Sequence, residues 1–159
     1  MMDIISCGVY LFDNHNELLL EHPTGHKSNI WTIPKGRMDV GETDYFEVAK
    51  RELQEETGVI LDDLNIIKFE EFEIVRHRNT NKYLKSFFIK VTNDFSNFEF
   101  GCESMVYRNG LPVFPEVDDY KFVTMDEARD ILNESQLINL DRCQQLLSEK
   151  IHIRKFNDY

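Results

Sequence analysis

The sequence has 159 residues, of which 42% are hydrophobic and 30% are charged, a balance typical of a folded chain rather than a disordered one. Eighteen basic and 29 acidic residues give a formal net charge of −11. This negative field repels phosphates and excludes a general binder of DNA or RNA. No apolar run approaches the ~20 residues that span a bilayer, and the first residues lack the basic segment of a targeting signal, so we expect no membrane insertion.

The three cysteines are Cys7, Cys102 and Cys143, and no two of them form a Cys-x-x-Cys pair. An odd number of widely spaced cysteines predicts reduced thiols that fill space in a core, as in a cytoplasmic protein, and does not indicate a disulfide framework.

The first 58 residues predict a hairpin, a glycine-punctuated loop and a helix. Strand-like composition is found at 4–12 and 17–21, around the turn residues Asp13 to Asn16. A polar loop and a short apolar piece, residues 30–33, lead to Pro34 and then to a loop containing Gly36 and Gly41. We expect a helix from about Asp44 to Thr57, ended by Gly58 because glycine readily adopts the positive φ of a helix C-terminus.

The remainder predicts a second hairpin, a long loop and two helices. The hairpin strands are expected at 66–77 and 83–92, and a later strand at 119–124. Residues 93–115 mix aromatic residues with Gly and Pro, and we interpret them as a long loop or insertion that can carry a short strand. Thr124 or Asp126 can cap a helix that ends at Leu132, and an amphipathic helix is expected from about Ser135 to Lys150. The order of elements predicts one α/β domain over 1–159, with a mixed sheet covered by helices.

Three carboxylates gather on one side of the first predicted helix. At 100° per residue, Phe46, Ala49 and Leu53 form an apolar stripe that should face the sheet. Glu52 and Glu56 lie one turn apart on the shoulder of this stripe, and Glu55 lies beside them. The carboxylates are therefore expected next to buried surface.

Two interpretations of this acidic shoulder remain open from the residues alone. It can be a solvated face in which Arg51 pairs with Glu55. Alternatively it can be a cation site, because like charges one turn apart destabilise a helix unless a cation binds between them. Mg²⁺ prefers oxygen ligands, and the preceding glycine-rich loop can bring backbone groups close to a metal or a phosphate.

The same segment resembles the Nudix box, G-x5-E-x7-R-E-U-x-E-E-x-G-U, in which U is a bulky aliphatic residue. Gly36 and Glu42 match its first block, and the run from Arg51 to Val59 matches every defined position of the second. Weaker similarity extends through the lead-in Trp31-x-x-Pro34-Lys35-Gly36 and through residues 119–128. The resemblance implies the Nudix fold, a mixed β-sheet sandwiched between helices, with the box at 36–59.

One departure separates this chain from the pattern. Eight residues lie between Glu42 and Arg51, where the family has seven. The apolar helix residues keep their places when counted back from Arg51, so the extra residue is expected near Thr43 and Asp44. The helix carboxylates carry over from the family, whereas the position of Glu42 relative to them does not follow from the sequence.

The resemblance implies a pyrophosphohydrolase that uses Mg²⁺ or Mn²⁺ to cleave a substrate built on a nucleoside diphosphate. The implied metal ligands are Glu52, Glu55, Glu56 and a backbone carbonyl of Lys35 or Gly36. Arg51 would orient Glu52 or Glu55 through its guanidinium group. The general base varies within the family, and the candidates here are Glu56, Glu42 and Glu116.

Basic residues must offset the negative field wherever a phosphate binds. The candidates for substrate binding are Lys35, Arg37, Arg76, Arg78, Lys82 and Lys85, with Tyr83, Phe87 or Phe88 as a ring for base stacking. Because strand residues alternate, Phe87 and Phe88 should point to opposite faces.

The lead-in favours the branch that cleaves dinucleoside polyphosphates such as diadenosine tetraphosphate, with RNA 5′ ends as related substrates. The alternatives are a MutT-like nucleoside triphosphate pyrophosphohydrolase, an ADP-ribose pyrophosphatase, and a Nudix module that senses nucleotides without cleaving them. The expected partner is a nucleotide, and the chain is expected to be a monomer or a homodimer.

Overall fold

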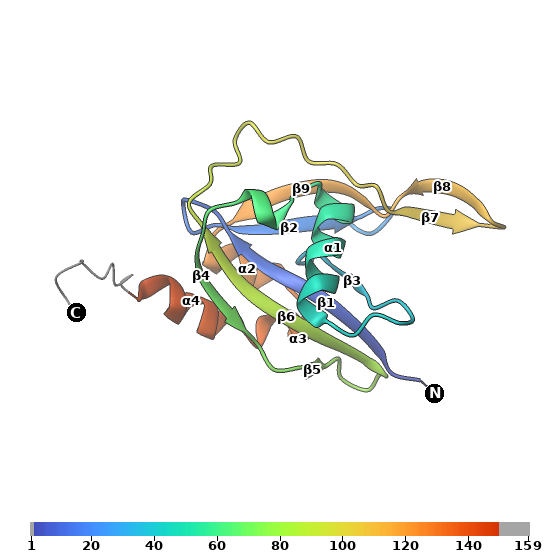
Figure 1. Ribbon diagram of the computed structural model, residues 1–159, viewed down its shortest axis with the longest axis horizontal. Coiled ribbons are helices and arrows are strands. Elements are labelled where there is room, and N and C mark those ends of the chain that lie inside the picture. Colours follow the sequence, from blue (N-terminus) through green and yellow to red (C-terminus); the bar gives the residue numbers. More distant parts are fainter. Residues whose placement is uncertain (1, 150–159) are drawn as a thin grey trace.

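The computed structural model describes residues 2–149 and has a mixed seven-stranded sheet at its centre. The path of the sheet is β4-β6-β1-β2-β9, with β3 paired to β1 and β5 paired to β6. The strands are β1 (Ile4–Phe12), β2 (Leu18–Pro23), β3 (Lys35–Arg37), β4 (Ile66–Glu71), β5 (Val75–Arg76), β6 (Lys82–Val91) and β9 (Val117–Val123). β1 and β6 run parallel at the centre, from Ile4 opposite Lys82 to Phe12 opposite Lys90, and the other pairs are antiparallel (Figure 1).

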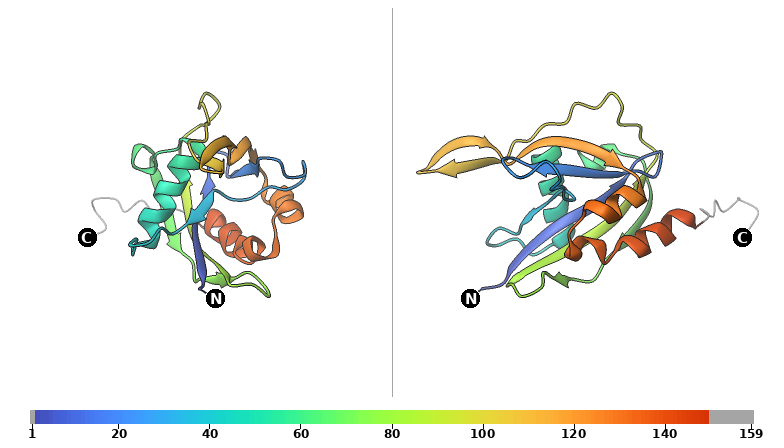
Figure 2. Two further views of the ribbon diagram at one scale, coloured as in Figure 1. Left: turned by 90° about the vertical axis from the view of Figure 1, so that its right-hand side faces the viewer. Right: turned by 180° about the vertical axis from the view of Figure 1, so that it is seen from behind.

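Helices cover both faces of this sheet (Figure 2). Helix α1 (Tyr45–Thr57) lies on one face, and α2 (Met125–Ile131), α3 (Glu134–Leu137) and α4 (Leu140–Ser148) lie on the other; a short 3-10 helix, η1 (Leu61–Asp63), follows α1. The expected sheet between helices is confirmed. No helix of residues 2–149 has the length and apolar character needed to span a membrane.

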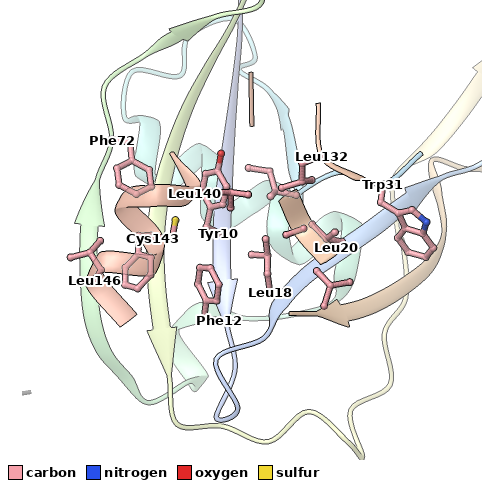
Figure 3. Packing of buried hydrophobic residues seen from close by; sticks show 14 of the residues in the cluster. Tyr10, Phe12, Leu18, Leu20, Trp31, Phe72, Leu132, Leu140, Cys143 and Leu146 are labelled. Carbon is pink, nitrogen blue, oxygen red and sulfur yellow. The ribbon is translucent and has the colours of Figure 1, made fainter. Parts of the chain in front are cut away.

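Each face of the sheet has its own hydrophobic core because strand side chains alternate. Tyr10 and Phe12 point toward α2 and α4 and pack with Leu140 and Leu146 (Figure 3). Cys7, Val9 and Leu11 point the other way and pack against Ala49 and Leu53 of α1. Phe87 and Phe88 are both buried and belong to opposite cores, as the alternation predicts.

Several predicted elements are confirmed. Residues 4–12 form β1, and Thr124 caps α2 through a hydrogen bond from the Glu127 N–H. Residues 66–71 and 82–91 form the antiparallel β4–β6 pair, but the strand predicted over 66–77 is interrupted after Glu71 and resumes as β5 at Val75–Arg76. Cys7, Cys102 and Cys143 are free thiols, and Cys7 and Cys143 are buried.

Two further predictions about elements need correction. Residues 35–37 form β3, where a loop was expected, because they pair with residues 6–8 of β1. The helix expected at 135–150 is divided into α3 and α4, and its last residue lies outside the described part of the chain. The break lets the buried Gln136 side chain accept a hydrogen bond from the Ile33 N–H at 3.0 Å while Leu140 turns into the core.

Residues 93–115 end in a hairpin, β7 (Met105–Arg108) and β8 (Leu111–Pro115), which forms a separate two-stranded sheet. The hairpin projects from the body beside the start of β9 (Figure 1). Its base is closed by a hydrogen bond of 2.9 Å from the Glu116 N–H to the Ser104 carbonyl.

Candidate active site

Helix α1 begins and ends with the residues that the sequence indicated. The Asp44 carboxylate accepts hydrogen bonds from the N–H groups of Phe46 and Glu47 at 3.0 and 3.2 Å. Gly58 ends the helix with φ 81°, in the left-handed region that glycine adopts without strain. With Ala49 and Leu53 buried on the sheet side, the adjoining shoulder turns toward β3.

On that shoulder Glu52 and Glu56 are 8% and 5% exposed, so both carboxyl groups are largely removed from water. Glycine at position 36 makes the close approach of β3 possible, because a Cβ atom there would lie 1.9 Å from Oε2 of Glu52. The N–H of Lys35 donates to Oε2 of Glu56 at 3.2 Å. Strand β3 and helix α1 are therefore in contact at the carboxylates of Glu52 and Glu56.

Arg51 connects the two blocks of the box. Its Nε and Nη2 donate to the two carboxylate oxygens of Glu42, at 3.1 and 2.7 Å. Its Nη1 lies 2.9 Å from Oε1 of Glu52 and 3.2 Å from Oε2 of Glu55. The longer connection between Glu42 and Arg51 therefore does not separate the two side chains.

The surroundings shift the carboxyl groups in opposite directions. Burial, followed by the charge of Glu56, raises the pKa of Glu52 to about 7. Burial also raises the pKa of Glu56. The hydrogen bond from Arg51 lowers the pKa of Glu42, so this carboxylate stays ionised, and both of its oxygens accept hydrogen bonds from Arg51.

Glu21, on β2, is a buried carboxyl group of this site that the sequence analysis missed. It is 4% exposed and lies close enough to Glu56 for the charge of Glu56 to act on it, and its Oε1 has no hydrogen-bond partner. Burial and the neighbouring Glu56 charge hold the pKa of Glu21 well above its ordinary value. The strand period gave a signal, because Glu21 shares a face with the buried Leu19.

A cleft of about 640 Å³ opens along these residues. Most of the predicted site residues line it, with Ser6, Ser104 and Asp39 in addition: Lys35, Gly36, Arg37, Arg51, Glu52, Glu55, Glu56, Lys82 and Glu116. They come from β3, α1, the start of β6 and the base of the β7–β8 hairpin. Glu116, from the segment just before β9, adds its charge to those that raise the pKa of Glu56.

Six of the residues predicted to bind substrate or to stack on a base do not line this cleft: Arg76, Arg78, Tyr83, Lys85, Phe87 and Phe88. Arg76 and Tyr83 line two neighbouring hollows. Lys85 is buried: its Nζ lies 2.8 Å from Oε1 of Glu71 and donates to the Phe72 carbonyl at 2.6 Å. The structure therefore places the buried Lys85 in an ion pair with the exposed Glu71 rather than at the cleft.

The donor atoms of the cleft are suited in kind to a hard divalent cation. Carboxylate oxygens converge from α1, Gly36 leaves room for the Glu52 carboxylate, and Glu21 presents an unpaired buried oxygen near Glu56. Within residues 2–149, no three His, Cys, Asp or Glu side chains are already arranged as a metal-ligand set. Since Arg51 holds Glu52 and Glu55, a cation would bind only as these side chains reorient.

The fold and the cleft together define a class: an α/β protein whose glycine loop and acidic helix enclose buried carboxylates, as in pyrophosphohydrolases. Comparison with known families identifies it further. The NUDIX domain model matches residues 2–141, so the chain belongs to the NUDIX family. The expected family and fold are thereby confirmed, and with them the assignment of the chain as an enzyme of the pyrophosphohydrolase type.

The individual proteins that match this chain have low sequence identity to it or match only part of it. An uncharacterised 17.7 kDa protein of enterobacteria phage T4 is 24% identical over 84% of this chain and 91% of its own length. The asymmetrical bis(5′-nucleosyl)-tetraphosphatase of Mus musculus is 38% identical over 77 residues, which are 42% of this chain and 50% of the mouse protein. The chain thus matches about half the length of that relative.

Among solved structures, the C. elegans Ap4A hydrolase binary complex superposes with a TM-score of 0.66 at 21% sequence identity. The superposition covers 90% of this chain and 98% of the other. At this identity the similarity concerns the fold.

Proposed function

We propose that this chain is a divalent-metal-dependent hydrolase that cleaves a pyrophosphate linkage in a dinucleoside polyphosphate. The observation that carries this proposal is the cleft in which the buried Glu52 and Glu56 face the glycine of β3, with Lys35, Arg37 and Lys82 on the same walls. Carboxylates beside cations suit a substrate that is a polyanion with bound metal.

Glu52 and Glu56 are the residues we expect to hold the cation, together with Glu55 and the backbone carbonyl of Gly36. When bound, a divalent cation supplies neutralisation of the pyrophosphate charge and acidification of the attacking water. Arg51 hydrogen-bonds both Glu52 and Glu55, at 2.9 and 3.2 Å, and so holds the two carboxylates beside the cleft.

Glu56 is the first candidate for the general base, because it is buried, has a raised pKa and lines the cleft. Glu116 is the second candidate, since it enters the same cleft from the base of the β7–β8 hairpin. Glu42 is the weakest of the three, because Arg51 engages both of its oxygens.

Lys35, Arg37 and Lys82 are expected to bind the phosphates. The preference for a dinucleoside polyphosphate rests on the Trp31-x-x-Pro34-Lys35-Gly36 lead-in and on the local similarity to the mouse tetraphosphatase. RNA 5′ ends, nucleoside triphosphates and ADP-ribose are the competing substrates.

A substrate panel in ¹⁸O-labelled water tests this proposal. The panel contains diadenosine tetraphosphate, 5′-triphosphate RNA, nucleoside triphosphates and ADP-ribose, each with Mg²⁺. We expect the highest kcat/KM for diadenosine tetraphosphate, and the label identifies the phosphorus attacked. A preference for nucleoside triphosphates would overturn the substrate assignment, and nucleotide binding without any product would indicate a sensing module.

Glu56→Gln serves as the matched variant in this panel. We expect turnover to fall by orders of magnitude, because a cation ligand and the candidate base are lost together. The thermal midpoint should stay similar or rise, since a buried like charge disappears. A folded Glu56→Gln protein that retains full activity would contradict the role of this residue.

A further inference from the structure

The β7–β8 hairpin exposes apolar side chains and extends away from the rest of the protein (Figure 1, Figure 2). Tyr107, Leu111 and Val113 are 62%, 68% and 47% exposed. Among residues 105–115 the only charged residue is Arg108, although 30% of the whole chain is charged. A two-stranded hairpin is at best marginally stable in water, so pairing with a further strand would stabilise this one.

The backbone of β7 has hydrogen-bonding groups along its outer edge. In an antiparallel strand, successive residues turn their N–H and C=O groups to opposite edges. The Ser104 carbonyl accepts a hydrogen bond from the Glu116 N–H at 2.9 Å, so residue 104 turns toward the β8 side. The alternation then turns the backbone groups of Met105 and Tyr107 outward. Among residues 2–149, neither of these two N–H groups has a hydrogen-bond partner outside the β7–β8 pair.

Other strand edges carry residues that oppose the addition of a strand. On β8, Pro112 and Pro115 lie opposite the two outward residues of β7, and proline has no N–H to donate to a neighbouring strand. β4 and β9, at the two ends of the main sheet, carry charged side chains such as Lys68 and Lys121, which discourage pairing at an edge. Residues 105–107 include neither proline nor a charge, so the outer edge of β7 is open to a further strand.

The outer edge of β7 is complementary to itself in an antiparallel arrangement. With Val106 on a two-fold axis, Met105 of one copy would face Tyr107 of the other, and the outward N–H and C=O groups of both residues would pair across the axis. The same register places Val106 opposite Val106 and Arg108 opposite Ser104, so no like charges meet. Because the chain has a net charge of −11, the positive charge of Arg108 is also attracted to a second copy.

We propose that β7 pairs with β7 of a second copy of this chain in antiparallel orientation, so that the two hairpins form one continuous sheet, in the order β8-β7-β7-β8, across a two-fold axis at Val106. The residues of this interface, 105–107, do not line the catalytic cleft, so the proposal goes beyond the proposed function. Two hairpins bury less surface than a standard interface, and we therefore expect a weak dimer, with a dissociation constant on the order of 10 µM.

Sedimentation velocity of the full chain tests the dimer. We expect a monomer at about 1 µM and a dimer at about 100 µM, and a monomer at both concentrations would overturn the proposal. Tyr107→Pro removes an outward N–H, as Pro112 does on β8, and should raise the dissociation constant about thirtyfold, as for the loss of one hydrogen bond from each copy. Tyr107→Ala keeps the N–H and should have a smaller effect. Equal effects of the two variants would show that the backbone edge does not form the interface, and would overturn strand pairing.

Val106→Lys and Val106→Glu test the position of the two-fold axis. Either variant alone places like charges opposite each other and should remain a monomer at about 100 µM, whereas an equimolar mixture of the two should form the dimer again. Val113→Lys adds the same charge on β8 and should leave the dimer intact, and circular dichroism confirms that each variant is folded. A dimer that persists in both Val106 variants would place the interface elsewhere, and a mixture that stays monomeric would exclude this register; either result would overturn the proposal.

Discussion

At the scale of single residues, the site depends on the absence of one side chain. Gly36 pairs with Cys7 of β1, so its backbone is held in place by the sheet. The Glu52 carboxylate occupies the space where a Cβ atom of residue 36 would lie. Because β3 and α1 are both packed elements, neither can retreat without a cost to the core.

Gly36→Ala should therefore displace the Glu52 carboxylate while leaving the fold intact. We expect kcat to fall about a hundredfold or more, as for the misplacement of a catalytic group by about 1 Å, and Mg²⁺ affinity to fall with it. Calorimetric titration with Mg²⁺ and steady-state kinetics measure the two effects. Gly110→Ala is a control, because a Cβ there meets nothing within 4 Å and the residue lies in the distant β7–β8 turn, although its positive φ adds some strain. Normal Mg²⁺ affinity in Gly36→Ala would show that Glu52 is not a ligand.

Residue-level prediction from the sequence succeeds where a pattern fixes spacing. The box spacing placed Glu52, Glu55, Glu56 and Arg51 along one shoulder of α1, and the structure brings them together. Glu21 and Lys85 could not be assigned in this way, because their environments depend on which strands are neighbours. Lys85 meets Glu71 only because β4 and β6 pair, and Glu21 meets Glu56 only because β2 and α1 contribute to the same face of the sheet.

At the scale of elements, α1 carries the site, and its N-terminus lies where the residue additional to the family pattern is expected. Asp44 stands where the additional residue was placed, and its carboxylate satisfies two N–H groups of the first turn. Glu42, just before it, still reaches Arg51 with both oxygens. The longer connection between Glu42 and Arg51 therefore accommodates both the N-cap at Asp44 and the contact between Glu42 and Arg51.

Asp44→Ala should lower the free energy of unfolding by about 1 kcal/mol, the usual cost of losing an N-cap acceptor. Asp44→Asn should retain most of the stability, because an amide oxygen accepts the same hydrogen bonds. Urea denaturation of the two variants measures the difference. If Asp44→Ala and Asp44→Asn destabilise equally, the charge of Asp44 matters and the capping geometry does not.

Elements with a local signal were predictable, whereas elements set by tertiary contacts were not. Asp44, Gly58 and Thr124 marked helix ends that the structure confirms. The division between α3 and α4 had no such signal, since the sequence there is amphipathic throughout. It follows from Gln136, whose side chain reaches Ile33 and whose carbonyl accepts from the Tyr10 hydroxyl at 2.6 Å.

At the scale of the whole molecule, acidic charge is concentrated where a cation is expected to bind. Glu21, Glu52 and Glu56 are buried within one site, and burial raises the pKa of all three. In a chain of net charge −11 this arrangement opposes folding as long as the site holds no cation. Lys35, Arg37 and Lys82 on the walls of the cleft are in no ion pair among residues 2–149, so their positive charge offsets part of the negative field there. They do not pair with the buried carboxylates.

Mg²⁺ should therefore stabilise the whole protein. A ligand that binds the folded state alone, at a hundred times its dissociation constant, contributes about 2.7 kcal/mol, which for a chain of this size raises the thermal midpoint by about 5–10 °C. Differential scanning calorimetry with MgCl₂, and with KCl at equal ionic strength, separates specific binding from screening. Glu52→Gln should fold without Mg²⁺ about as well as the wild type, because its neutral amide avoids the burial of a charge. It should lose most of the Mg²⁺-dependent rise, and an equal rise in both proteins would place the cation elsewhere.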